Sequence, residues 1–491
     1  MGTVVPLIAC SSLVAAALVA RADRDRALLL LGGLLGAALV LGAHIADADQ
    51  VESLADRPAL AAVGAALGLV VLGALALLFA RVPSALPLAA VATIPFRIPL
   101  SIGGSTASLL LPLYLVIAAG ALAWGVPRLA RRGDPLAAEA PAGPRAGGLE
   151  WALATVLVLY AVGAAWTSDS DRALENVVFF FVPFAALFAL LARLVWTPRI
   201  AASSLGVLAG LAAALAVVGY VEYATRHLLL NPKVIASNQV EDYFRVNSLF
   251  FDPNIFGRFL AIVLVLLVAW MLWRRRPRGV ALAALLVAVI FGGLVLTLSQ
   301  SSFAALLAGL AVLGGLRWNP RRAALLAAGA LVIAAAAFAL SADWSSSDSR
   351  NDATSGRYEL LDGGLQLAGD RPFAGWGSGA FAREYRRARD VSAERATSAS
   401  HTIPVTVAAE QGLIGLAAYL VLLWLAFRRL LSGARADPAR AGVAAAFAAI
   451  VVHTLMYAAF LEDPLTWALL GVGTALAAAA ASGTREAGRV P

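Results

Sequence analysis

Three side chains with the chemistry to bind an anion or to move a proton lie beside apolar segments of this chain. Arg245 lies in Y-F-R-V-N-S-L, Arg357 in S-G-R-Y-E-L-L, and His401 in S-H-T-I-P. Arginine keeps its charge at physiological pH, and its planar guanidinium binds phosphate through two hydrogen bonds. An imidazole with a pKa of about 6.5 suits the removal of a proton from a hydroxyl group. If the three groups converge, they would combine anion binding with proton transfer.

The segment after Arg245 adds a helix N-terminus to this candidate site. Asp252 and Pro253 are typical of an N-cap and of a first helical position, so a helix is expected to begin there. Asn254 and Arg258 would then lie along its first turn, where the positive helix end favours anions. Together with Arg245 they are expected to form a cationic site for an anionic head group. Taken alone, Arg245 is more typical of an interfacial arginine that snorkels or binds a lipid phosphate.

Arg357 and His401 flank most of a hydrophilic interlude, residues 341–401, which we interpret as a lid over the site. Arg357 opens a segment predicted to be helical, although two glycines weaken that helix. The local sequence explains Arg357 equally well as a solvated charge, and a lone interfacial histidine is more often structural than catalytic. Glu410 lies within the next apolar segment, where a carboxylate normally has a partner or a role. In the helix predicted after Arg357, the apolar residues Tyr358, Leu361, Leu365 and Ala368 are spaced to lie on one face.

The composition identifies an integral membrane protein. Only 14% of the 491 residues are charged and the mean hydropathy is +0.82, whereas about a quarter of the residues of a soluble protein are charged. Apolar runs of about 17–25 residues, enough to cross the hydrocarbon core as a helix, recur along the chain. Strand-like alternation is absent. The predicted fold is therefore all-α, a polytopic transmembrane bundle of about 12–15 spans with one large extracytoplasmic helical loop.

Cysteine, metal and nucleic-acid chemistry have little support in the sequence. The single cysteine, Cys10, excludes an internal disulfide framework and a multi-cysteine metal site. No cluster of carboxylates, histidines or cysteines has metal-ligand spacing in the predicted outer segments, so neither a metal nor another cofactor is expected. Lys and Arg number 38 against 30 Asp and Glu. The positions of the arginines are explained by membrane topology, so no nucleic-acid partner is expected.

The arginines predict which loops face the cytoplasm. If the loop of residues 21–26 lies on that side, alternation of the spans places the basic segments at Arg128 and Arg193 there too. The acidic loops and the hydrophilic interlude then lie outside the cytoplasm. Residues 82–96 are short and interrupted by proline, and we interpret them as a short span or a re-entrant segment. By segment order the chain divides into N-terminal transmembrane helices (1–221), central transmembrane helices with the Arg245 loop (222–340), the extracytoplasmic loop (341–402), and C-terminal transmembrane helices with a cytoplasmic tail (403–491).

Four motifs, in order and spacing, resemble the O-antigen ligase and polymerase family of bacterial membrane proteins. They are R-V-N-S-L-F-F-D-P-N from Arg245, L-T-L-S-Q-S-S from Leu296, S-G-R-Y-E-L-L with D-R-P-F-A-G-W-G-S-G-A-F, and S-H-T-I-P-V-T-V-A-A-E-Q-G-L-I-G-L from Ser400. The resemblance covers residues 245–419, and A-T-I-P-F-R-I-P-L, which contains Arg97, is a weaker echo upstream. It implies a GT-C-like membrane protein in the bacterial cytoplasmic membrane. Such a protein transfers a glycan from an undecaprenyl-diphosphate carrier to an acceptor on the outer face.

The resemblance also implies roles for individual residues. Arg245 and Arg357 would grip the diphosphate of the lipid-linked donor, and His401 would act as general base on the acceptor hydroxyl or orient it. The reaction would be inverting and independent of metal. The partners would be a lipid-linked oligo- or polysaccharide, a glycan or lipid acceptor, and membrane lipids. One departure is Ser299-Gln300, because the family often has Ser-Arg there. Further substrate contacts are expected from Asn254, Arg258, Gln300, Arg97 and Glu410.

Other functions remain open at the level of sequence. A solute transporter of similar hydropathy would place ionisable groups near mid-bilayer on broken helices. Here the candidate groups, apart from Glu410, cluster at the outer interface, which favours an enzyme. An inactive scaffold for envelope assembly is a third hypothesis, supported only by Gln300. Within the enzyme hypothesis, the sequence does not separate a ligase from a polymerase.

Overall fold

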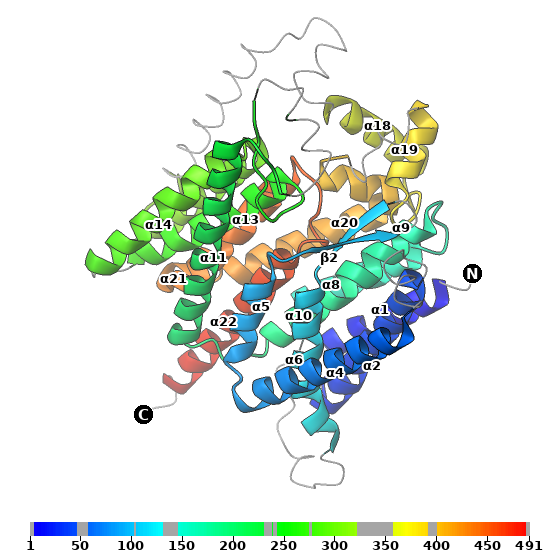
Figure 1. The fold of residues 1–491 in the computed structure, drawn as a ribbon, viewed down its shortest axis with the longest axis horizontal. Coiled ribbons are helices and arrows are strands. Elements are labelled where there is room, and N and C mark those ends of the chain that lie inside the picture. Colours follow the sequence, from blue (N-terminus) through cyan, green and yellow to red (C-terminus); the bar gives the residue numbers. More distant parts are fainter. Residues whose placement is uncertain are drawn as a thin grey trace, which may run out of the picture. The chain divides into compact units, whose positions relative to one another are not determined.

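The computed structural model describes residues 4–46, 57–102, 105–130, 146–229, 238, 243–273, 277–321, 357–390 and 400–487. Within these ranges the regular secondary structure is helical apart from one two-stranded hairpin (Figure 1). Nine of the described helices are long and apolar enough to cross a membrane, and four shorter apolar helices accompany them. The predicted class, a polytopic helical bundle, is confirmed. Of the predicted extracytoplasmic loop 341–402, residues 341–356 and 391–399 lie outside the described residues.

The chain forms two compact units that each draw on separate stretches of sequence. The first unit comprises Met1–Ala165, Ala173–Leu208 and Leu461–Ala475, and the second comprises Trp166–Arg172, Ala209–Phe460 and Leu476–Pro491. The four-part division by segment order stays a prediction. Most of the residues singled out from the sequence belong to the second unit, and Arg97 belongs to the first.

The first unit is built on helices that approach closely at small residues. Its elements include α1 (Val4–Val19), α2 (Asp23–Ile45), α4 (Pro58–Arg81), α6 (Leu111–Ala130), α8 (Gly148–Gly163) and α10 (Val182–Leu191). A Cβ on Gly33 of α2 would lie 2.5 Å from Val14 Cγ2 and 3.0 Å from the Cys10 carbonyl oxygen of α1. Close backbone approach at glycine is typical of helices that pack in lipid. The glycine therefore sets the contact between α1 and α2.

The region predicted as a short or re-entrant span contains a short helix, and the residues that follow it form a hairpin that the sequence did not predict. Helix α5 covers only Ala85–Thr93. It is followed by an antiparallel hairpin of β1 (Ile98–Ile102) and β2 (Ser105–Leu109), in which Ile98 pairs with Leu109 and Ile102 with Ser105. The hairpin is a correction to the purely helical expectation. Two five-residue strands joined by glycines form too short an apolar alternation to stand out from the surrounding hydrophobic sequence.

The second unit has α13 (Pro253–Trp273), α15 (Gln300–Arg317) and α21 (Pro438–Thr454) at its centre. A Cβ on Gly309 of α15 would lie 2.5 Å from Val265 Cγ2 of α13 and 3.3 Å from the Ala445 carbonyl oxygen of α21. The three helices therefore meet at one glycine. The unit also contains α14 (Pro277–Leu296), α18 (Arg357–Asp370), α19 (Phe381–Arg389) and α20 (Ile403–Leu431), and parts of α11 (Pro198–Thr225) and α22 (Pro464–Ala487).

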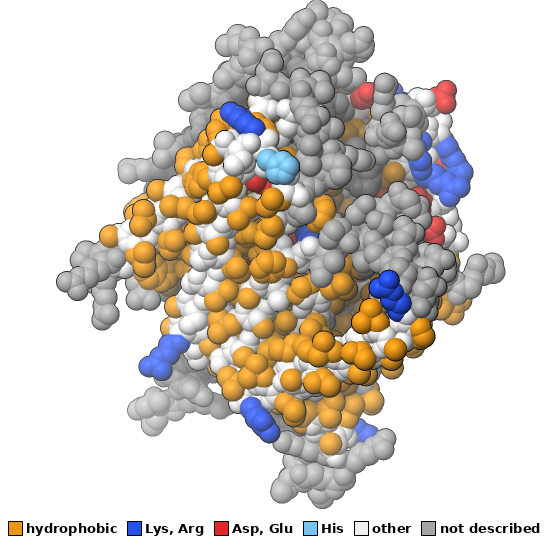
Figure 2. Space-filling model, viewed as in Figure 1, with side chains coloured by type: hydrophobic (Ala, Val, Ile, Leu, Met, Phe, Trp, Pro, Cys, Tyr) orange, Lys and Arg blue, Asp and Glu red, His pale blue; other side chains and the backbone are white. Residues whose placement is uncertain are grey.

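The described surface is largely apolar. Hydrophobic side chains cover much of the face seen in Figure 2, and charged side chains are sparse there. Exposed hydrophobic residues occur along whole helices, as in α4, where Leu60, Val63 and Leu67 are all more than half exposed. Such continuous exposed apolar surface is characteristic of helices that face lipid.

Candidate functional site

Arg245 is held by neutral hydrogen-bond acceptors at the start of α13. Its Nε donates to the Thr297 carbonyl oxygen at 3.0 Å, and its Nη2 donates to Asn254 Oδ1 at 3.1 Å. Asp252 caps the helix as the sequence predicted, because its Oδ1 accepts from the backbone amides of Asn254 at 2.6 Å and Ile255 at 3.3 Å. The cap orients the first turn of α13, and Asn254 in turn orients the guanidinium.

A chain of buried hydroxyl groups connects this arginine to a histidine of α21. Ser299 caps α15 and donates to Asn254 Oδ1 at 2.9 Å, and its Oγ lies 2.8 Å from Ser302 Oγ. His453 Nε2 lies 3.1 Å from Ser301 Oγ and 3.3 Å from Ser302 Oγ. His453 and the three serines are fully buried. Buried polar groups that satisfy one another in this way fix side-chain orientation.

His401 lies against Tyr457 at the start of α20. The ring centroids are 5.2 Å apart, and the Tyr457 hydroxyl donates to Asp252 Oδ2. Burial and the positive charge of Arg357 lower the pKa of His401, while Asp252 opposes this effect. The imidazole is therefore neutral near pH 7. Its Nδ1 is buried and makes no hydrogen bond to any residue the structure describes.

Arg245, Arg357 and His401 belong to one region of the second unit, where Arg357 lies close enough to each of the other two groups to interact with it electrostatically. Burial lowers the pKa of Arg357, and repulsion from Arg245 lowers it further. Arg357 acts on His401 in the same way. Two guanidinium groups close enough to repel each other form a site where an anion would relieve unfavourable charge. Tyr457, whose pKa burial and the nearby Asp252 carboxylate raise well above its usual value, stays a neutral hydrogen-bond donor.

The five predicted substrate contacts have different surroundings. Asn254 binds Arg245, as described above. Arg258 is buried and its Nη1 donates to the Ala459 carbonyl oxygen at 2.7 Å, so it orders the loop that carries Tyr457. Gln300 is exposed at the first position of α15. Glu410 is buried, and its Oε1 accepts from the Phe381 amide at 3.3 Å. Arg97 is half-buried within the first unit.

The loop between α18 and α19 replaces missing hydrogen bonds in α20. Gly412 interrupts α20 with a φ of 64°. The amides of Trp376 and Gly377 donate to the carbonyl oxygens of Ala409 at 2.9 Å and Glu410 at 2.8 Å, and the Leu413 amide donates to the Pro372 carbonyl oxygen at 2.7 Å. The D-R-P-F-A-G-W-G-S-G-A-F motif is thus the partner of the broken helix, which explains its glycines.

Helix α18 forms where predicted but buries a different face. Tyr358 and Leu365 are 44% and 56% exposed, whereas Leu360, Leu367 and both glycines are buried. The predicted apolar face is therefore wrong. A Cβ on Gly363 would lie 2.4 Å from Tyr385 Cε2, and one on Gly364 would lie 2.7 Å from Val405 Cγ1. The glycines that weaken the helix in isolation are the surface against which α19 and α20 pack.

Several positioning residues escaped the sequence reasoning. Glu222 is buried in α11, and its Oε2 accepts from the Asn247 amide at 3.2 Å and the Ser248 amide at 2.8 Å, which fixes the loop after Arg245. His453 and Tyr457 were also missed. A carboxylate and an imidazole inside apolar segments were the available signals, since such groups are normally partnered. Nothing local marked Tyr457.

Comparison with known proteins supports the motif analysis. Residues 286–420 match the family model described as O-antigen ligase. The resemblance predicted from the four motifs is thereby confirmed over this segment, which contains Gln300, Arg357, His401 and Glu410. Arg245 and Asn254 lie upstream of the match. No curated protein matches the chain.

Proposed function

We propose that this protein, which carries an O-antigen ligase domain in residues 286–420, transfers a glycan from an undecaprenyl-diphosphate-linked donor to an acceptor hydroxyl. The reaction takes place at the outer face of the bacterial cytoplasmic membrane. The observation that carries the proposal is a series of contacts: His401 packs on Tyr457, Tyr457 donates to Asp252, and Asp252 caps the turn whose Asn254 binds Arg245. Arg357 lies close enough to lower the pKa of His401. Glycan transfer needs the two functions these side chains provide, an anion clamp and a base.

The arginines bind the diphosphate and stabilise it as it leaves. Arg245 donates to an amide oxygen and a carbonyl oxygen, and neither of these neutral acceptors cancels its charge. Arg357 is repelled by Arg245. As the bond between the anomeric carbon and the diphosphate oxygen breaks, negative charge grows on the leaving group. Preorganised guanidinium groups then stabilise the transition state more than the ground state.

His401 removes the proton from the acceptor. Its lowered pKa keeps the imidazole neutral, with a lone pair available near pH 7. The acceptor oxygen loses its proton to His401 and forms the new bond to the anomeric carbon as the diphosphate leaves from the opposite face. The configuration is inverted. The imidazolium then releases its proton, and the arginines do the work that a metal would otherwise do.

The remaining predicted residues have supporting roles in this proposal. Asn254 orients Arg245. Arg258 acts through the loop that carries Tyr457, and Glu410 holds the start of α19, the second helix of the lid. Gln300 contacts the donor or the acceptor directly. The lid excludes water, which limits hydrolysis of the donor.

A reconstituted transfer assay tests the proposal. The purified protein in proteoliposomes is given a lipid-linked glycan and an acceptor, with Arg245→Ala, Arg357→Ala and His401→Ala as variants. Each is expected to lower the rate about 100-fold or more, because each removes a group that acts on the transition state. Arg387→Ala is the matched control. It removes a more exposed arginine that pairs with Glu384 at 2.8 Å on α19, and it should transfer at the wild-type rate. Near wild-type transfer in all three site variants would refute the mechanism.

A deletion strain distinguishes a ligase from a polymerase and from an inactive scaffold. Mass spectrometry of envelope glycans should show long polymer on the lipid carrier if the protein is a ligase, and single repeat units if it is a polymerase. Accumulation of neither would favour the scaffold. Uptake of a solute by the proteoliposomes without transfer would favour the transporter.

A further inference from the structure

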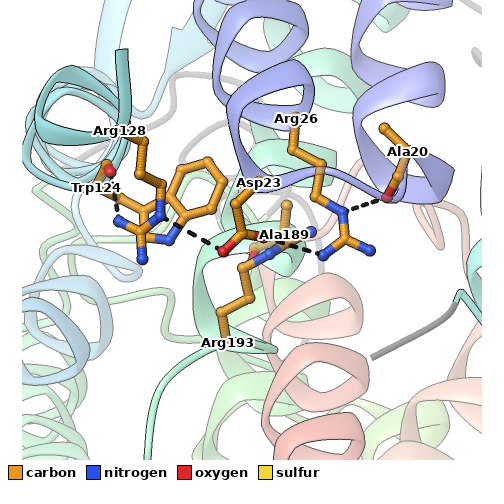
Figure 3. Close-up of polar contacts among 7 residues, drawn as sticks. All are labelled: Ala20, Asp23, Arg26, Trp124, Arg128, Ala189 and Arg193. Atoms are coloured by element: carbon orange, nitrogen blue, oxygen red, sulfur yellow. Dashed lines mark hydrogen bonds and ion pairs between the residues drawn. The ribbon is translucent and has the colours of Figure 1, made fainter. Parts of the chain in front are cut away.

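Three arginines gather at one end of the first unit, around Asp23 at the start of α2 (Figure 3). Arg26 Nη1 lies 3.4 Å from Asp23 Oδ1, and Arg128 Nε, at the end of α6, lies 3.6 Å from Asp23 Oδ2. Arg193 follows α10. Because the cluster joins the start of α2 to the ends of α6 and α10, the three basic segments lie on one side of this unit, as the arginine distribution predicted.

Arg193 is the least satisfied member of the cluster. Its Nη1 donates to the Ala189 carbonyl oxygen at 2.5 Å, and its guanidinium lies 5.2 Å from the centre of the Trp124 ring. Arg128 lies over the same ring at 4.5 Å. The Nε of Arg193 is buried and has no hydrogen-bond partner in the part of the chain that the structure describes. A buried donor without an acceptor is costly, and an incoming oxygen would satisfy it.

The charges in the cluster do not balance. Burial, followed by repulsion from Arg26, lowers the pKa of Arg193 to about 10, and Arg128 acts in the same direction. Asp23 and Glu150 oppose the shift. Three cations thus face two carboxylates, and the exposed residues Arg21, Arg24 and Asp25 nearby add further net positive charge.

The surroundings of the cluster suit a lipid. Exposed apolar side chains lie within two positions of each arginine, namely Leu28 (51% exposed), Val126 (48%) and Val195 (78%). Tryptophan is typical of the membrane interface, and basic pockets between helix ends on the cytoplasmic side bind the head groups of anionic lipids. The cytoplasm is the side on which the sequence places these three segments.

We propose that Arg26, Arg128 and Arg193 form a binding site for the phosphate group of an anionic phospholipid. The phosphate oxygens accept from Arg128 and Arg193, and the acyl chains lie along the exposed apolar side chains. This site is separate from the proposed glycan transfer and does not depend on it. The competing interpretation is an ion-pair lock, in which Asp23 ties the helix ends together and no ligand is needed.

Native mass spectrometry of the detergent-solubilised protein tests the site. Phosphatidylglycerol and phosphatidylcholine with the same acyl chains are compared, and inorganic phosphate is tested separately by its effect on thermal unfolding. The wild type should retain phosphatidylglycerol in preference to phosphatidylcholine. Arg193→Gln should lower that retention about tenfold, the effect of losing one charged hydrogen bond. Arg199→Gln is the matched control, because Arg199 is an exposed arginine six residues further along the chain, and it should bind like the wild type.

Asp23→Asn distinguishes the phosphate-binding site from the ion-pair lock. It also tests the proposal if Arg193→Gln does not fold. Removing the carboxylate removes the competitor of the phosphate, so phosphatidylglycerol should bind about tenfold more tightly. A lock predicts lower thermal stability and no change in lipid retention, which would overturn the proposal. Equal retention of both lipids, or equal retention by Arg193→Gln, would also overturn it. Stabilisation by inorganic phosphate that Arg193→Gln abolishes would support the phosphate site and make its source soluble.

Discussion

The two units hold their arginines in opposite ways. In the first unit Arg26 and Arg128 contact the Asp23 carboxylate at 3.4 and 3.6 Å. In the second unit Arg245 is held by the Thr297 carbonyl and the Asn254 side-chain amide, at 3.0 and 3.1 Å. Both arrangements fix a guanidinium. A carboxylate also cancels part of its charge, whereas an amide fixes it and leaves the charge available to a ligand.

This difference separates arginines whose charge a carboxylate already neutralises in part from an arginine whose charge can stabilise negative charge that appears during a reaction. Ionic contacts in the first unit are partly exposed, with 44% of Asp23 and 38% of Arg128 accessible, so their contribution to stability is modest. The hydrogen bonds of Arg245 are also only partly buried, but both of their acceptor residues, Thr297 and Asn254, are buried. Burial makes a preorganised charge more effective toward a developing anion.

The largest effect should follow from replacing the planar guanidinium group of Arg245 with an amine that keeps the positive charge. Arg245→Lys retains one positive charge but cannot donate to both Thr297 and Asn254 while binding phosphate with two further N–H groups. We expect kcat to fall about 100-fold. Arg26→Lys, in the first unit, should leave transfer unchanged. Transfer kinetics in proteoliposomes measure both, and a kcat for Arg245→Lys within threefold of wild type would show that charge alone suffices.

A second substitution places a carboxylate beside Arg245, as Asp23 lies beside the arginines of the first unit. Asn254→Asp keeps an acceptor for Arg245 and Ser299 but adds a carboxylate that competes with the diphosphate. We expect the KM for the lipid-linked donor to rise about tenfold. Asn319→Asp adds the same charge at an exposed position beyond the other end of α15 and serves as the control. If both aspartates left KM unchanged, the uncompensated charge of Arg245 would not be what binds the donor.

Substitution of His453, which lies at the end of the hydroxyl chain away from Arg245, should have a smaller effect on transfer. His453→Ala removes the group within 3.1–3.3 Å of Ser301 and Ser302, so Ser299 and Asn254 become less fixed and Arg245 loses orientation. We expect kcat/KM to fall about tenfold, with partial recovery in His453→Gln, which can still hydrogen-bond the serines.

Thr454→Val is the control for that experiment, because it removes a neighbouring buried hydroxyl of α21 that donates to the Val451 carbonyl oxygen rather than to the serines. Thermal unfolding separates the two roles. A purely structural histidine would lower stability equally in the Ala and Gln variants and leave kcat/KM of the folded fraction unchanged.

Local chemistry made part of this site predictable. Residue types alone indicated the cap at Asp252 and the membrane spans, because capping and hydropathy depend on neighbouring residues. The prediction of the apolar face of α18 was wrong because Gly363 and Gly364 pack against Tyr385 and Val405. Glycines contribute no hydrophobic side chain from which a buried face could be predicted.

The hydroxyl chain could not be read from the sequence for a different reason. His453 and Ser301 are separated by 152 positions. Their hydrogen bond depends on how α15 and α21 pack, which no local pattern encodes. Only the packing shows that serines of the S-Q-S-S run hydrogen-bond with Asn254 and His453.

The smallest expected effect is a shift in the pH dependence of transfer. His401 acts as a base only when neutral, so kcat/KM should rise with pH through the lowered pKa of His401, with a midpoint below about 6.5. Asp252 favours the charged imidazole. Asp252→Asn keeps the helix cap, since asparagine caps as well as aspartate, and removes that charge. The midpoint should therefore move to lower pH, by less than about one unit, in pH profiles of transfer.

Asp362→Asn, which removes a carboxylate paired with Arg389, should leave the midpoint in place. A midpoint that rose in Asp252→Asn would mean that the group titrating in the reaction is not a base stabilised in its charged form by Asp252, and His401 would lose its proposed role.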